Sequence, residues 1–377
     1  MRRFNRILTS LIALILIITS AVSCSKEFDF GFKELCFYHP HTAPVKINVD
    51  WDHFRHIEEP TGMTVYVWPL NEDEKISRFV THRLDSVTLD LKAGFFHTFA
   101  FNQSDSEYGT IEFYNLEDFD KAEARVKQTK SSWYQTKNPD TKLGTEPEWL
   151  AIDCLKDIEV TEQMVKIAEE EFIAAKTKVK AKANTRAQVT KSQNDVGTLK
   201  PKSIIKNVDI YIHIENIHML HSARAVIKGL AEGCYISSKK TTPNQIAHTV
   251  EDWVLIFDED ENGVKSDNTG VIKTSITTFG LPDGHNGYAA ENEFYVQLRL
   301  ADKEGTVMEH TFHVGELIKD MNSYDGTHKD KDGNPVWPEL HVNWPEPLPE
   351  IEIGSDGGFD IGVGGWGDEI VTEIPLL

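Results

Sequence analysis

Residues 207–214 read NVDIYIHI, and this stretch indicates the fold class. Its aliphatic residues occupy every second position, which is the pattern of a half-buried β-strand. Similar runs recur along the chain, separated by turn residues at intervals of about ten positions. These predicted strands are residues 45–49, 63–68, 87–91, 95–101, 110–114, 223–230, 271–279, 293–300 and 306–314. Short strands at such spacing predict an all-β protein built as sandwiches or barrels.

The strand runs fall into two groups, which predicts two tandem β-sandwich domains at residues 35–160 and 203–343. Between them, residues 161–202 are expected to form a helix and a linker. Thr161 is placed to cap a helix that runs to about Lys182, and residues 176–202 are basic, polar and predicted to be an exposed loop. Residues 253–257, WVLIF, predict a strand covered on both faces. The Pro- and Gly-rich residues 344–377 predict an extended tail whose alternating Ile and Val could form a strand.

The N-terminus carries the features of an export signal. Three arginines precede an apolar run at residues 11–18, so residues 1–23 are predicted to be a signal peptide. Residues 21–24, Ala-Val-Ser-Cys, resemble a bacterial lipobox, which makes Cys24 the lipidated first residue of the mature chain. Residues 24–34 would then be a lipidated tether, and residues 25–29 resemble the surface-export signal of Bacteroides-type lipoproteins. We therefore expect attachment to the outer membrane or cell surface through Cys24, because several acyl chains on one residue anchor a protein stably.

Charge and cysteine content restrict the partners. Lysine and arginine number 39 against 60 acidic residues, giving a formal net charge of −21. Nucleic-acid and anionic-lipid surfaces are poor partners for such a chain, since phosphate contacts need basic groups. Beyond Cys24, the chain has Cys36, Cys154 and Cys234, an odd and widely spaced set that is more typical of single buried thiols than of a disulfide framework.

Motifs for catalysis are largely absent from the sequence. It has no Gly-x-Ser-x-Gly, no His-Glu-x-x-His and no phosphate-binding loop, so we expect no enzymatic activity and assign no catalytic residue. Asp258, Asp260 and Asn262, followed by Gly263, match the first positions of a calcium loop, but Thr269 stands where a bidentate Glu belongs. The alternative is an acidic hairpin turn, and no other cofactor is expected.

Two further features bear on glycans. Residues 85–87, Asp-Ser-Val, match a short O-glycosylation sequon at Ser86. Aromatic residues that could line a glycan site are Trp51, Tyr66, Trp68, Trp133, Trp149, Trp337 and Trp344. Scattered tryptophans more often belong to cores, so clustering on an exposed face would be needed for a glycan site.

A family resemblance adds to these expectations. Residues 35–42, LCFYHPHT, followed by Val49-Asp50-Trp51 and then by residues 62–69, GMTVYVWP, resemble an uncharacterised Bacteroides-type lipoprotein family of the fimbrillin-like group. That group has two transthyretin-like β-sandwiches and a lipobox, and the resemblance implies a pilus subunit, anchor or adhesin. It also implies joining of subunits by β-strand addition, in which a terminal strand of one subunit fills a groove in the next. The tail at residues 351–377 could be such a strand or could pack on its own domain.

The sequence therefore predicts a surface-anchored fimbrial or adhesive lipoprotein whose partners are other fimbrial subunits, host ligands or glycans. A glycan-binding lipoprotein for nutrient uptake is the alternative. A free hydrophobic groove would favour the first function, and exposed clustered tryptophans would favour the second.

Overall fold

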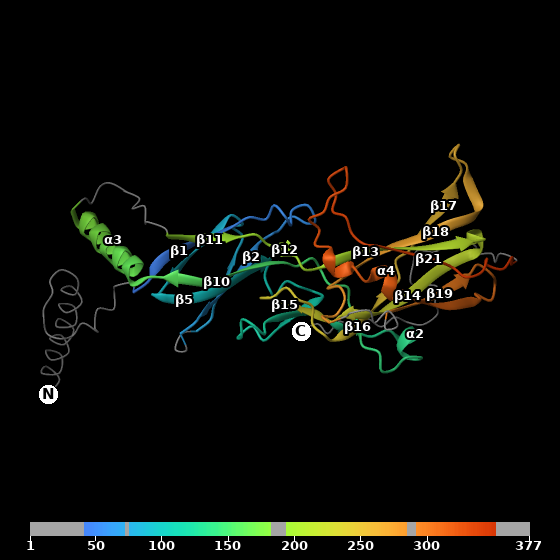
Figure 1. Ribbon diagram of the computed structural model, residues 1–377, viewed down its shortest axis with the longest axis horizontal. Helices are drawn as coiled ribbons and strands as arrows, with labels where there is room; N and C mark the ends of the chain where they lie inside the picture. Colours follow the sequence, from blue (N-terminus) through green and yellow to red (C-terminus); the bar gives the residue numbers. More distant parts are fainter. Residues whose placement is uncertain (1–40, 72–74, 182–193, 285–291, 352–377) are drawn as a thin grey trace, which may run out of the picture. The chain divides into compact units, whose positions relative to one another are not determined.

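Strands dominate the structure, a computed structural model that describes residues 41–71, 75–181, 194–284 and 292–351 (Figure 1). The all-β fold class predicted from the sequence is confirmed, together with the helical insertion. The chain divides into two compact units. One consists of Met1–Lys46, Thr88–Gly94 and Glu159–Asp195, and the other of Ile47–Val87, Phe95–Ile158 and Val196–Leu377.

The main helix of the structure lies in the first of these units. Helix α3 covers Glu162–Ala181, and Thr161 caps it as predicted, because its hydroxyl accepts a hydrogen bond of 3.2 Å from the Met164 amide. A three-stranded sheet has the order β11-β1-β4, formed by Asn194–Leu199, Ala43–Val49 and Ser86–Leu91. The helix predicted to run to about Lys182 is confirmed, because α3 ends at Ala181. The exposed loop predicted for residues 176–202 overlapped that helix, and it is wrong at its other end, where β11 begins at Asn194. A short strand needs few apolar residues, so the polar composition concealed β11.

The first sandwich combines a five-stranded and a three-stranded sheet. The larger has the order β12-β10-β5-β2-β3, formed by Lys202–Ser203, Ala151–Val160, Gly94–Asn102, Met63–Pro69 and Ser77–Thr81. The smaller has the order β15-β7-β6, formed by Gly233–Tyr235, Glu123–Val126 and Ile111–Tyr114. One cluster of buried side chains joins the two sheets, with Trp68, Phe99 and Phe101 from the larger and Ile111 and Ala124 from the smaller. Burial of these side chains drives the packing of the two layers.

The second sandwich also has two sheets. One has the order β17-β18-β13-β21, formed by Val254–Glu259, Lys265–Thr278, Lys206–Glu215 and Glu339–Asn343. The other has the order β20-β19-β14-β16-β9-β8, formed by Val307–His313, Glu293–Leu300, Leu220–Ala231, Gln245–Val250, Leu143–Gly144 and Gln128–Thr129. The alternation in residues 207–214 has the predicted effect, because Val208, Ile210, Ile212 and Ile214 all point into the shared core.

Strands β8 and β9 come from the earlier part of the chain, yet they extend a sheet of the second sandwich. The same region holds the short helix α2 (Ser132–Gln135), and helix α4 (Gly315–Ile318) lies later in the chain. The domain boundaries predicted at residues 160 and 203 stay a prediction.

Strand β17 corrects the interpretation of residues 253–257. Only Trp253 is fully buried, whereas Val254 is 57% exposed and Ile256 46% exposed. The strand lies at the edge of its sheet rather than in a covered interior. Its apolar composition therefore reflects an uncovered edge, which periodicity alone cannot distinguish from a buried strand.

Candidate binding surfaces

Strand β17 is an apolar edge that is open along its length. It pairs with β18 on one side, and among the described residues no strand pairs with its other side. Val254 and Ile256 point to solvent from the outer face, while Leu255 and Phe257 are only partly buried where they pack against the core. Natural sheets normally protect such an edge with charges, proline or a covering segment. β17 has none of these before Asp258.

Close packing positions this edge. Gly270 of β18 stands opposite Phe257, and a Cβ atom at Gly270 would lie 2.4 Å from the Ile256 carbonyl oxygen. Only glycine therefore allows β17 to approach β18 at this point. The edge strand β20 of the other sheet differs, because its exposed positions include Glu309, Thr311 and His313. The edge strands β17 and β20 are thus chemically distinct.

The predicted calcium residues lie at the end of β17. Asp258 is exposed on the strand, and Asp260 begins the turn that follows. The Asp260 carboxylate accepts hydrogen bonds of 2.8 Å from the amides of Asn262 and Val264, and these bonds lower its pKa. Among the described residues, no group of three or more His, Cys, Asp or Glu side chains is arranged to hold a metal. Calcium binding here stays a prediction, and the residues adopt a hairpin turn between β17 and β18.

A second surface is a shallow pocket of about 680 Å³ beside β6, the edge strand of the three-stranded sheet. Its walls combine aromatic and aliphatic side chains with charged groups. The lining residues are Arg78, Asp105, Ser106, Tyr108, Ile111, Glu112, Phe113, Tyr114, Leu116 and Lys127. Strands β3 and β6 and the segments between strands contribute to it, so residues far apart in the sequence meet here.

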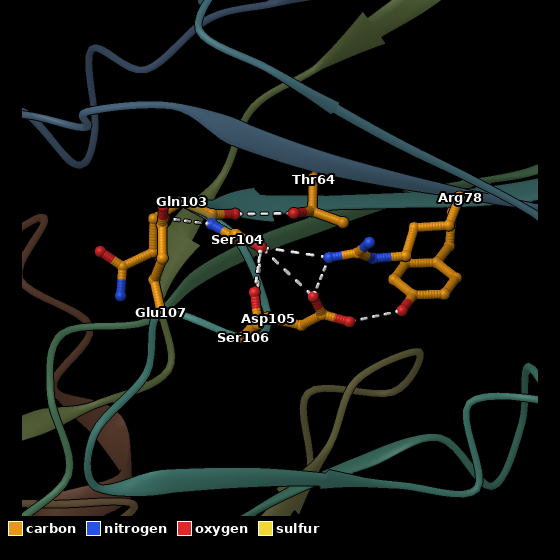
Figure 2. A network of polar contacts seen from close by, with 8 residues as sticks. Thr64, Arg78, Gln103, Ser104, Asp105, Ser106 and Glu107 are labelled. Atoms are coloured by element: carbon orange, nitrogen blue, oxygen red, sulfur yellow. Dashed lines mark hydrogen bonds and ion pairs between the residues drawn. The ribbon is translucent and has the colours of Figure 1, made fainter. Parts of the chain in front are cut away.

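A polar network fixes one wall of this pocket (Figure 2). Asp105 is its centre: its carboxylate pairs with Arg78 of β3 and accepts a 2.7 Å hydrogen bond from the Tyr66 hydroxyl. Arg78 also donates to the Ser104 hydroxyl at 3.1 Å, and the Glu107 carboxylate accepts the Ser104 amide at 3.0 Å. These bonds tie the loop after β5 to β2 and β3.

Aromatic side chains of β6 also line the pocket. Phe113 stacks on Phe101 with ring centroids 4.9 Å apart, and Tyr114 is 40% exposed with the Arg125 guanidinium 4.7 Å from its ring centre. The Tyr114 hydroxyl donates to Glu112, which raises the pKa of Tyr114. Lys127 donates to the carbonyl oxygens of Tyr108 and Gly109. An aromatic surface beside fixed hydrogen-bonding groups suits a polar ligand with apolar faces, such as a sugar.

The tryptophans considered for a glycan site do not gather on an exposed face of the described residues. Trp51, Tyr66, Trp68, Trp133 and Trp344 are buried. Trp149 and Trp337 are partly exposed and lie against each other, with ring centroids 5.5 Å apart. Tyr66 and Trp68 do lie behind the pocket, but they support its wall from inside the core.

The remaining sequence-predicted residues are dispersed. Cys24, Cys36 and the tail beyond Ile351 lie outside the described residues. Ser86 is 4% exposed in β4, and its hydroxyl contacts the Asp85 carboxylate at 3.3 Å, so glycosylation there stays a prediction. Cys154 and Cys234 are free thiols. No described helix has the length and apolar character needed to cross a membrane.

The sequence missed the residues of the pocket. Arg78, Asp105, Tyr114 and Lys127 are separated by intervals that carry no motif, and only the pairing of β6 with β7 and of β2 with β3 brings them together. The one available signal was the polar cluster at residues 103–107 directly after an apolar strand.

Comparison with known proteins places the chain in a family. The profile of the family described as "Domain of unknown function (DUF5119)" matches residues 23–251, more than half of the chain. The chain belongs to the DUF5119 family. This confirms the predicted membership of an uncharacterised family. No curated protein matches the chain in sequence.

Several solved structures are similar to this DUF5119 chain. A candidate adhesin from Bacteroides ovatus has 14% identity and a TM-score of 0.46, covering 81% of this chain and 94% of that one. A candidate adhesin from Bacteroides thetaiotaomicron has 10% identity and a TM-score of 0.42, with coverage of 80% and 92%. The fimbrial anchor protein Mfa2 from Porphyromonas gingivalis has 13% identity and a TM-score of 0.40, with coverage of 80% and 90%.

Proposed function

We propose that this protein is a surface-anchored fimbrial or adhesive component that joins a partner subunit by β-strand addition. The observation that carries the proposal is the open, apolar edge of β17. An incoming strand would pair with the free backbone groups of this edge, and its alternate side chains would cover Leu255 and Phe257. The occupant is an extended terminal strand of another subunit.

The start of the C-terminal tail supports a role for strand exchange. Leu348 is fully buried and its amide donates to the Glu215 carbonyl oxygen at 3.0 Å, while Asn216 donates to the Leu348 carbonyl oxygen at 2.8 Å. The tail is therefore anchored at the second sandwich before residues 352–377, where Ile353, Phe359, Ile361 and Val363 carry apolar side chains on strand-like spacing. A tail held at its base can reach a neighbouring subunit.

Anchoring is the second part of the proposal. Lipidation of Cys24 would attach the chain to the outer membrane, and the predicted tether at residues 24–34 would lead to the first domain. A chain that keeps its lipid is suited to be the anchor of a fimbria rather than a repeating shaft subunit. The names of the similar structures, which include a fimbrial anchor and adhesins, belong to the same functional class.

The size of the native lipoprotein tests this proposal. Extracted gently from its own cells and run unboiled on a denaturing gel, the protein should migrate as a large species that collapses to a monomer on boiling. Leu255→Lys should abolish that species, because the incoming strand would cover this side chain and bury its ammonium group. If the chain also donates a strand through its tail, deletion of residues 352–377 should likewise remove the large species.

The matched control is Thr311→Lys, which places the same charge at an exposed position of the other edge strand, β20. It should leave the large species intact. A monomer band for the wild-type protein, or equal behaviour of the two lysine variants, would contradict strand addition at β17.

The pocket beside β6 favours a second candidate function, glycan binding. We propose that Tyr114 supplies the apolar face for a sugar ring and that the groups near Arg78 and Glu112 fix its hydroxyls. Tyr114→Ala should weaken binding on a glycan array at least fivefold, since lost ring contact is worth about 1 kcal/mol. Phe95→Ala removes an aromatic ring that is 49% exposed outside the pocket and should change nothing. Array binding that is absent, or equal for both variants, would refute this function.

A further inference from the structure

A second cavity of about 320 Å³ has an unusual charge for this acidic chain. It lies where β12, β13 and the turn after β15 meet, and its floor includes Phe279 and Ile204. Four lysines line it, against two aspartates, in a protein with a formal net charge of −21. These charged residues are Lys202, Lys206, Lys239, Lys240, Asp283 and Asp325. The cavity is therefore a local positive site.

Two of the lysines are held by ion pairs. The Lys202 ammonium lies 3.4 Å from Asp325, and that of Lys239 lies 2.7 Å from Asp153. Asp325 also accepts hydrogen bonds from the amide and hydroxyl of Thr327, which together with Lys202 lower its pKa. Asp325 already accepts from Lys202 and Thr327, so its carboxylate does not neutralise the other lysines of the cavity.

Lys206 is the decisive residue. It is only 8% exposed, it lines the cavity from the start of β13, and its ammonium group has no hydrogen bond or ion pair among the described residues. Burial lowers the pKa of Lys206, against the weaker effect of Asp325, which acts in the opposite direction. Burying a charged side chain costs free energy unless it is paired, so an anion bound in the cavity would stabilise the charged form of Lys206.

The uncharged polar groups of the wall are already engaged. The Asn322 side chain bonds both the amide and the carbonyl oxygen of Leu281 at 2.8 Å, and the Thr241 hydroxyl donates to the same carbonyl oxygen at 2.7 Å. Cys234 is buried, and burial raises the pKa of its thiol to about 12, so it stays neutral. Lys240 is exposed at the rim, and within the described residues its ammonium group has no partner. The free cations of the cavity are therefore Lys206 inside and Lys240 at the mouth.

We propose that this cavity binds a small molecule carrying an oxyanion, such as a carboxylate, sulfate or phosphate, with the Lys206 ammonium as its inner contact and Lys240 closing the mouth. The volume is at the lower end for ligand pockets, which suits a single acidic sugar or a molecule of that size. The site is separate from β17 and from the pocket beside β6, so it does not depend on the proposed function.

Thermal unfolding of the full chain in matched ionic strength tests the site. Inorganic phosphate, sodium sulfate and sodium glucuronate are compared with chloride, and at least one should raise the unfolding temperature of the wild-type protein by several degrees at saturation. The three salts distinguish phosphate, sulfate and carboxylate as the preferred group. Lys206→Met, which keeps the length of the side chain, should weaken the apparent affinity at least tenfold. Lys303→Gln, an exposed lysine in the β19–β20 turn, should behave as wild type.

A second measurement uses only the wild-type protein, so it tests the site even if Lys206→Met does not fold. Reductive methylation of the wild-type protein, read by mass spectrometry, should modify Lys206 at least fivefold more slowly with the effective anion than with chloride, while Lys303 is unchanged. If none of the three anions shifts the unfolding temperature or protects Lys206, the proposal is overturned. An equal shift in wild type and Lys206→Met would overturn it as well.

Discussion

Replacing Trp68 by alanine should lower the free energy of unfolding by about 3–5 kcal/mol. Trp68 is 5% exposed at the centre of an aromatic cluster, with its ring centroid 4.4 Å from that of Phe99 and 5.3 Å from that of Phe119. Its indole N–H donates to the Leu116 carbonyl oxygen at 3.0 Å. The alanine variant would therefore leave a large cavity and an unpaired carbonyl group in the wall of the pocket beside β6.

Trp68→Phe separates these two losses. It keeps an aromatic ring in the cluster but removes the hydrogen bond to Leu116, so it should cost about 1–2 kcal/mol. Urea unfolding followed by circular dichroism measures both variants. Because Leu116 lines the pocket, Trp68→Phe should also weaken any ligand bound there. A cost below about 1 kcal/mol for Trp68→Ala would show that the cluster is not part of a single packed core.

The sequence indicated where strands lie along the chain, but it did not indicate which strands are neighbours in a sheet. A capping threonine marked the start of α3. Alternation located β13, which has one buried face, and β5, which is buried on both faces from Thr98 to Asn102. It could not show that β17 is an edge strand. An apolar run looks the same whether it is covered or exposed, and the difference depends on sheet order, which is a long-range property.

The binding surfaces were less predictable than the fold. The network around Asp105 and the lysine cavity each bring together residues from several separate segments, with no spacing that a motif could detect. Lys206 precedes an apolar alternation and, in the sequence, resembles an ordinary flanking lysine. Its burial follows from the packing of the turn after β15 and of Asn322 around it, which only the folded chain shows.

Acid should destabilise this protein through His248. The side chain is completely buried in β16, opposite Ile227 of β14 and Gly144 of β9, and neither ring nitrogen has a hydrogen-bond partner among the described residues. Burial lowers the pKa of His248 from 6.5 to about 4. Below pH 6.5 the unfolded chain binds a proton at this residue and the folded chain does not, so stability falls as the pH drops from about 6.5 to about 4. Over that range the loss approaches about 3 kcal/mol.

His248→Leu should remove this loss, because leucine cannot bind a proton in either state. At pH 7 the variant should be as stable as wild type or up to about 2 kcal/mol more stable, since two unsatisfied buried nitrogens are removed. At pH 4.5 its advantage should be larger by about 2–3 kcal/mol, which urea titrations at both pH values would measure. His56→Leu changes an exposed histidine and should leave the pH dependence as in the wild-type protein. If the two leucine variants shared one pH profile, the imidazole of His248 would have to find a proton acceptor or solvent in the folded state, and the packing of β16 between β14 and β9 would have to be looser than described.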